Sequence, residues 1–158
     1  LVGSEMCIRD RTRSGTELFG QESDWCKSIA CPVDEAAEDF LQEKSMKTER
    51  FFGMLEAEGV SVEKDAPKLV LTRDSAGYVL NVRAGRSSIA GERFRQLFEL
   101  PSSCFFLEEQ GGKMVITTKG IGHGIGLDQY YANALAKQGA SAEEILELFF
   151  PGLLKKSE

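Results

Sequence analysis

The sequence has little of what several functional classes require. Its 158 residues include one histidine, one tryptophan and four prolines, and no apolar run is long enough to span a bilayer. The formal net charge is −6 and no basic stripe is present, so composition gives no support for a nucleic-acid partner or an anionic membrane surface. A hydrophobic share of 42% is instead typical of one soluble globular domain, or the larger part of one.

An export signal is also absent from the amino-terminal residues. Residues 1–11, LVGSEMCIRDR, resemble the translation of a sequencing adapter, and we exclude them from fold reasoning. We therefore expect residues 12–158 to be native and to continue a longer protein. Its start, together with any export signal or membrane anchor, is expected to lie upstream.

Cysteines are few, and Cys7 falls in the adapter-like stretch. Cys26 and Cys31 form a Cys-x-x-x-x-Cys pair, which is compatible with a short disulfide, with two thiols or with half of a metal site. A structural zinc site normally has four ligands, and only Cys104 and His123 remain as further ligands, so no metal is expected. We predict Cys104 to be a small buried side chain. No cofactor is expected either.

What the chain does have is a dense glycine pattern around its only histidine, GIGHGIG at residues 120–126. Alternating glycines allow positive φ angles and a close approach of the backbone to another chain or ligand. The alternation of residues 114–119 predicts a strand before the glycines, with Met114, Ile116 and Thr118 on one face. An apolar spacing after them predicts a helix that ends at Gly139. His123 is therefore expected at a strand-to-helix corner.

A strand, glycines and a helix are also the elements of a nucleotide-binding loop. The dinucleotide fingerprint Gly-x-Gly-x-x-Gly fails here, because its third glycine would fall on Ile125 or on Leu127. No Gly-Lys-Ser/Thr follows, and too little chain remains for a crossover to further parallel strands. Nucleotide binding is therefore not predicted.

The rest of the chain predicts an α+β fold with a mainly antiparallel sheet and packed helices. We expect loops over 12–40 and a helix over 48–58. A short helix should follow Ser88–Gly91 and stop before Pro101, and a last helix, capped by Ser141 and Glu144, should run through Phe149. Two hairpins are predicted, one of strands 68–73 and 78–83 and one of strands 104–109 and 113–119.

The glycine stretch and the residues after it closely resemble the carboxy-terminal signature of the stage II sporulation protein D family, the SpoIID/LytB domain. The matching segments are GIGHGIGLDQY at 120–130, Ala134, Ala136, Gly139, Glu144-Ile145-Leu146 and Phe150-Pro151-Gly152, with Gly91, Phe94, Arg95 and Leu100 upstream. The resemblance covers residues 69–152 and extends more faintly to Ser14, so residues 12–158 are expected to be a partial domain of this family. Asp128 replaces the family's usual serine and Tyr131 its usual glycine.

The resemblance implies a parent protein similar to lytic transglycosylases, which cleave the glycan strands of peptidoglycan after an amidase has removed their stem peptides. Such an enzyme can work with one carboxylic acid of raised pKa. In the family this glutamate lies in an upstream Val-x-x-Glu-x-Pro segment, which the chain lacks. Every glutamate from Glu17 onward is predicted in a loop or on a solvated helix face. We therefore nominate no catalytic residue and expect the chain alone to be inactive.

The resemblance also implies that one wall of the glycan groove is present. The candidate substrate-binding residues are His123, Gly122, Gly124, Gln129 and Tyr130. A purely structural alternative for His123 is a corner residue whose ring bonds a backbone carbonyl. For Tyr130 and Tyr131, packing on the apolar helix face is the favoured interpretation, and Asp128 is predicted to be the helix N-cap.

The sequence is compatible with three functions. The first is part of an extracytoplasmic, secreted or membrane-anchored enzyme that remodels peptidoglycan, acting in sporulation or more generally in the cell wall. The second is a non-catalytic module that binds glycan or regulates an amidase. The third is an unrelated cytoplasmic α+β domain. A catalytic glutamate or an export signal upstream would distinguish them.

Overall fold

The chain divides into two compact units, one inserted into the other. The computed structural model describes residues 11–16, 27–32, 38–62 and 68–152. The inserted unit is the continuous segment Leu41–Lys119, and the flanking unit combines Leu1–Phe40 with Gly120–Glu158.

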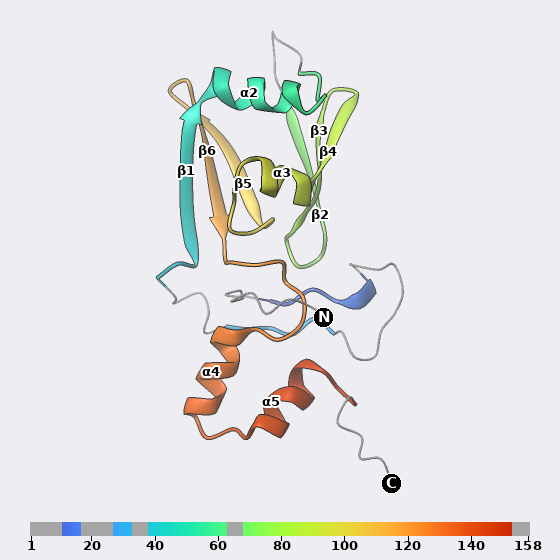
Figure 1. Ribbon diagram of the computed structural model, residues 1–158, viewed down its shortest axis with the longest axis vertical. Helices are drawn as coiled ribbons and strands as arrows, with labels where there is room; N and C mark the ends of the chain where they lie inside the picture. The colour runs from blue at the N-terminus through green and yellow to red at the C-terminus, as the bar shows by residue number, and fades with distance from the viewer. Residues whose placement is uncertain (1–10, 17–26, 33–37, 63–67, 153–158) are drawn as a thin grey trace. The chain divides into compact units, whose positions relative to one another are not determined.

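Two three-stranded antiparallel sheets form the frame of the inserted unit (Figure 1). One sheet has the order β1–β6–β5, with β1 at Leu41–Lys47, β6 at Lys113–Lys119 and β5 at Phe105–Gln110. The other has the order β2–β3–β4, with β2 at Leu69–Arg73, β3 at Val79–Ala84 and β4 at Ser87–Ala90. Together with the helices, these sheets confirm the predicted α+β class.

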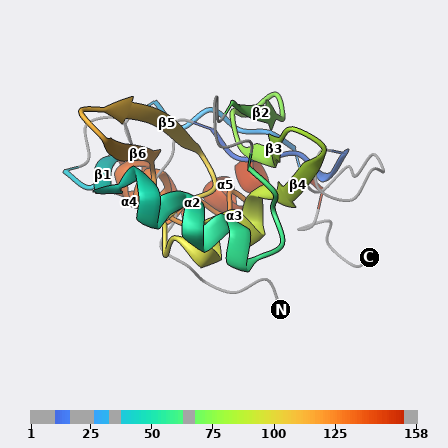
Figure 2. The same ribbon diagram turned by 90° about the horizontal axis from the view of Figure 1, so that it is seen from above.

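Helices α2 (Thr48–Ala57) and α3 (Gly91–Leu97) complete this unit. Helix α2 lies across one end of the sheets, and α3 lies against β3 and β4 (Figures 1 and 2). Their phenylalanines form the centre of the core. The ring of Phe94 lies 4.5 Å from that of Phe98 and 4.6 Å from that of Phe105, and Phe51 stacks on Phe98 at 4.8 Å. Burial of each such ring contributes roughly 1.5–3 kcal/mol to folding, so this cluster holds α2, α3 and β5 together.

The predicted hairpins are both present. In the first turn, Asp74 Oδ1 accepts hydrogen bonds from the backbone N–H groups of Ala76 and Tyr78, and Gly77 has a φ of +88°. An Asp side chain that bonds the backbone two residues on is a common turn device, which explains why this turn could be predicted. On β6 the predicted face of Met114, Ile116 and Thr118 is buried, as expected.

Two strands were not predicted. Strand β1 is polar and rich in Lys, Glu and Gln, and it pairs with β6 from Leu41 opposite Lys119 to Lys47 opposite Lys113. Strand β4 was predicted only as the approach to α3. The pairing of β1 with β6 brings both ends of the inserted unit together, and just beyond them Gly120 donates its N–H to the carbonyl of Phe40 at 2.6 Å.

The flanking unit contains helices α4 (Gln129–Lys137) and α5 (Ala142–Phe149), as predicted. They pack through a small cluster with Ala132, Ile145 and Phe149 at its centre. Ser141 and Glu144 form the predicted capping box at α5, and Gly139 has a φ of +98° after α4. Among the described residues, no helix is both long and apolar enough to cross a membrane.

Candidate functional site

The glycine loop at residues 120–126 connects β6 to α4, and every second residue in it has a positive φ. The angles are +69° at Gly120, +92° at Gly122, +83° at Gly124 and +81° at Gly126. Residues that carry a side chain are strained at positive φ. The backbone path of the loop therefore explains why glycine occupies every second position. Gly122 and Gly124 are buried, whereas His123 between them is half-buried.

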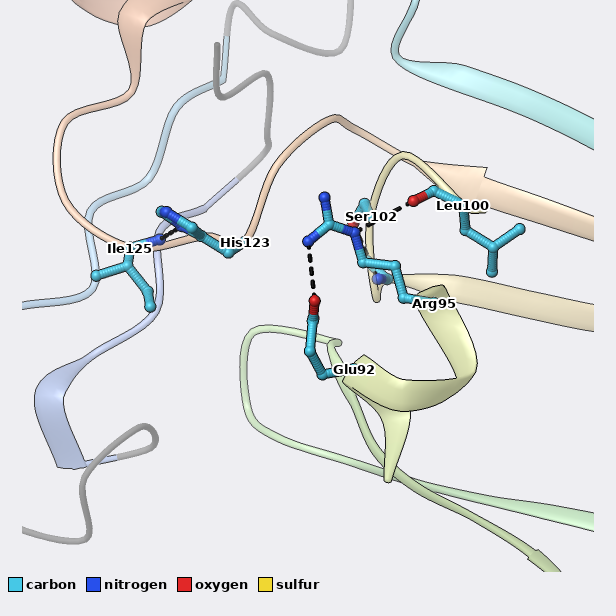
Figure 3. Close-up of polar contacts among 7 residues, drawn as sticks. Glu92, Arg95, Leu100, Ser102, His123 and Ile125 are labelled. Atoms are coloured by element: carbon cyan, nitrogen blue, oxygen red, sulfur yellow. Dashed lines mark hydrogen bonds and ion pairs between the residues drawn. The ribbon is translucent and has the colours of Figure 1, made fainter. Parts of the chain in front are cut away.

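The imidazole of His123 is oriented by the loop itself. Its Nδ1 accepts a hydrogen bond from the backbone N–H of Ile125 at 3.0 Å (Figure 3). A neutral ring that accepts at Nδ1 carries its proton on Nε2, which makes Nε2 a donor. The ring thus stabilises the turn, but through an N–H group rather than the carbonyl proposed in the structural alternative.

A segment from the amino-terminal part of the chain lies against the glycine loop. Arg13 donates its backbone N–H to the carbonyl of Gly124 at 2.7 Å. Next to it, Thr12 is almost fully buried; its N–H donates to Ile29 O, and its hydroxyl oxygen accepts from Ile29 N–H, both at 2.8 Å. Ser28 adds a hydrogen bond from its hydroxyl to the carbonyl of Thr12 at 2.7 Å. The sequence did not predict these contacts, because residues 12–40 carry no periodic pattern that indicates long-range pairing.

Asp128 caps helix α4, as predicted. Its side chain is fully buried, and Oδ1 accepts a hydrogen bond from the N–H of Tyr131 at 2.9 Å. A carboxylate also favours the positive end of the helix dipole. Serine, the usual residue of the family at this position, is an equally good N-cap, so the replacement preserves the local structure.

The first residues of α4 differ in exposure. Gln129 is half-buried, and Tyr131 packs against Phe149 with a ring separation of 6.2 Å. Tyr130 is 37% exposed, so the favoured interpretation that it packs in the core is wrong. Successive helix residues are about 100° apart, and the buried stripe is centred on Tyr131 and Ala132, which turns Tyr130 towards solvent.

The described glutamates offer no replacement for the expected catalytic acid. Every glutamate in the described ranges is exposed, including three on strands rather than on loops or helices: Glu43, Glu108 and Glu109. A hydrogen bond from Arg93 lowers the pKa of Glu58, and hydrogen bonds from Ser141 lower that of Glu144. A general acid needs the opposite shift.

The structure describes two of the cysteines, Cys31 and Cys104. Cys31 is buried in the cluster of α4 and α5, and its Sγ lies 3.6 Å from the carbonyl oxygen of Ile29. Cys26 lies outside the described residues, so the choice between a disulfide and two thiols stays open. Cys104 is buried, as expected. In the part of the chain that the structure describes, no three metal-ligating side chains are grouped.

The α+β fold carries the glycine loop, its histidine and the capped helix in the order that the sequence predicted. The chain is similar to proteins of the stage II sporulation protein D type, as its signature predicted. That of Bacillus amyloliquefaciens is 29% identical over 130 residues, or 82% of this chain. That of Bacillus subtilis strain 168 is 26% identical over 129 residues, or 81% of the chain.

This similarity covers only part of the relatives. The chain spans 37% of the length of each of these two proteins. A third relative, the amidase enhancer of Bacillus subtilis strain 168, is 44% identical over 46 residues, which is 29% of this chain and 6% of that protein. No protein-family profile matches the chain.

Proposed function

We propose that the chain is part of a sporulation-related protein that remodels the cell wall outside the cytoplasm, and that its glycine loop and α4 bind glycan strands. The names of the relatives, stage II sporulation protein D and amidase enhancer, support the biological setting. The observation that carries the binding site is the hydrogen bond from Ile125 to His123 Nδ1, because it fixes the orientation of the imidazole within the glycine loop.

The proposed site suits a sugar ligand chemically. N-acetyl carbonyls and hydroxyls accept hydrogen bonds from an imidazole N–H, and the Gln129 amide can both donate and accept. The exposed ring of Tyr130 can stack on the apolar face of a sugar. Gly122 and Gly124 are buried, so they would contribute by setting the path of the loop beside the ligand.

For the whole protein we propose lytic transglycosylase activity on glycan strands freed of stem peptides. One carboxylic acid would protonate the glycosidic oxygen, and its carboxylate would then assist attack by the 6-hydroxyl of the sugar. Because the described glutamates are exposed, that acid is expected elsewhere in the protein. We expect the 158-residue chain to bind glycan without cutting it.

A second candidate is a non-catalytic module that binds glycan or regulates a cell-wall amidase. The exposure of the described glutamates and the short match to the amidase enhancer favour it. The two candidates differ in one measurable respect. Addition of the chain to an amidase digest of peptidoglycan should accelerate peptide release if the chain is a regulator, and should leave the rate unchanged otherwise.

Two substitutions of His123 separate binding from turn stabilisation. His123→Asn keeps a side-chain oxygen that can accept from Ile125 N–H but removes the Nε2 donor, whereas His123→Ala removes both. We expect both variants to bind peptide-free glycan strands at least tenfold more weakly in a titration, with only His123→Ala losing stability as well. Unchanged binding by His123→Asn would show that His123 has only a structural role. Ser75→Ala, in the turn between β2 and β3, serves as a control outside the loop.

A further inference from the structure

The exposed aromatic ring of Phe106 lies beside two cationic side chains. The ring is 43% exposed on β5, whereas that of its neighbour Phe105 is fully buried. The guanidinium carbon of Arg73 lies 4.4 Å from the centroid of the Phe106 ring, and the Nζ of Lys119 lies 5.4 Å from it. Both distances are within the range of a cation–π interaction. Two positive charges are therefore held beside one exposed ring.

The guanidinium of Arg73 is fixed in this position by the backbone. Its Nη1 donates to the carbonyl of Gly77 at 2.9 Å, and its Nη2 donates to the carbonyl of Phe105 at 2.6 Å. The bond to Phe105 joins the end of β2 to β5, an edge strand of the other sheet (Figure 1). Two of the five N–H groups of the side chain are used in this way, which leaves donors for a further acceptor.

Within the described ranges, neither Arg73 nor Lys119 belongs to an ion pair. The ion pairs among the described residues are made by Lys44, Arg93 and Arg95, and no carboxylate of the described chain pairs with Arg73 or Lys119. Burial lowers the pKa of Arg73, and the nearby Cys104 and Asp74 offset this only in part. A partly desolvated cation without a counter-ion is unfavourable, so an anionic ligand would be stabilising here.

We infer that Arg73, Lys119 and Phe106 form a carboxylate-binding subsite for the glycan strand. This inference rests on the proposed function, because it takes the glycan as the ligand. A muramyl residue that has lost its peptide carries a free lactyl carboxylate, whereas a residue with its peptide carries an amide at the same position. The guanidinium can donate two parallel hydrogen bonds to a carboxylate, Lys119 adds charge, and the exposed part of the ring contacts sugar C–H groups. The subsite would thus distinguish peptide-free strands from substituted ones.

The experiment compares Lys119→Gln with a matched control, Lys113→Gln, which removes the same charge from the other end of β6. Lys119 is preferred to Arg73 as the test position because the Arg73 side chain also holds two backbone carbonyls. Binding is titrated with peptide-free glycan strands and with the same strands after their carboxylates have been converted to neutral amides. We expect the wild-type chain to bind the carboxylated strands about five- to tenfold more tightly, with the difference shrinking as salt is raised.

The variants give distinct outcomes. Lys119→Gln should lose most of the preference for carboxylated strands, keep its affinity for the amidated ones, and differ in this from Lys113→Gln. Equal binding of both strands by the wild-type chain would overturn the subsite while leaving the proposed function intact, and would point to an acidic protein surface as the counter-charge. Absence of binding to either strand would overturn the proposed function and this inference together.

Discussion

Asp128 Oδ1 accepts a hydrogen bond from the backbone N–H of Tyr131, 2.9 Å away, at the point where the glycine loop becomes α4. The carboxylate is fully buried, so the loop and the helix are joined by a group that water does not screen. The orientation of the residues at the start of α4, including Gln129 and Tyr130, depends on this cap.

We predict that Asp128→Ala lowers the free energy of unfolding by about 1–2 kcal/mol, the usual cost of losing an N-cap. Asp128→Ser keeps a side-chain acceptor and is the matched control, with a smaller loss expected. Urea denaturation followed by far-ultraviolet circular dichroism measures both. Equal stability of Asp128→Ala and the wild type would contradict the assigned capping role.

Two glycines in the inserted unit should respond oppositely to alanine. A Cβ at Gly91 would lie 1.7 Å from the carbonyl oxygen of Val79, a backbone atom that cannot move away easily. Gly91→Ala is therefore expected to destabilise by about 3 kcal/mol or more. Beyond the local backbone of α2, no atom lies within 4 Å of a new Cβ at Gly53, so Gly53→Ala should stabilise by roughly 0.5–1 kcal/mol. Thermal denaturation of the two variants tests the packing, and a stable Gly91→Ala protein would refute it.

The capping box of α5 predicts a pH dependence. Hydrogen bonds from the N–H and hydroxyl of Ser141 lower the pKa of Glu144 below its ordinary value of 4.5. A lowered folded-state pKa means that the stabilisation is complete above the unfolded-state pKa and is lost as the pH falls through the folded-state pKa. The wild type should therefore lose more stability between pH 5 and pH 3 than Glu144→Gln, which keeps a neutral box.

The comparison with Glu144→Gln isolates this carboxylate, because the pKa of Glu58 is also lowered and both proteins share that contribution. Helicity at 222 nm, recorded during thermal unfolding at each pH, is the measurement. Parallel pH profiles for the two proteins would mean that the box contributes nothing through its charge.

The segment Leu41–Lys119 is expected to fold as an isolated domain. Its core residues all lie within the segment, and its two ends pair in the β1–β6 ladder. An expressed 41–119 fragment should unfold cooperatively in urea and show dispersed amide signals in a proton–nitrogen correlation spectrum. A fragment ending at residue 112 lacks β6 and serves as the negative control. Collapse of both fragments into an aggregated or unfolded state would argue that the flanking unit is needed.

Local chemistry explains which parts of the fold could be predicted. The hairpin turn at Asp74 to Gly77, the capping box at Ser141 and Glu144, and the positive φ angles at 120–126 all depend on residues close in sequence. Strand β1 could not be predicted in this way. Its residues have weak strand preference, and it exists because β6, about 70 residues away, offers a free edge.

The candidate site shows the same division. The sequence predicted a strand-to-helix corner and its cap from the glycines, His123 and Asp128. This was possible because glycine conformations and N-cap hydrogen bonds depend on residues that are close in sequence. Tertiary structure alone placed Arg13 against Gly124 and left Tyr130 exposed. It also brought Arg73 of β2 onto the Phe106 ring of β5. Contacts between distant segments depend on how whole elements pack, and no local pattern in the sequence specifies that packing.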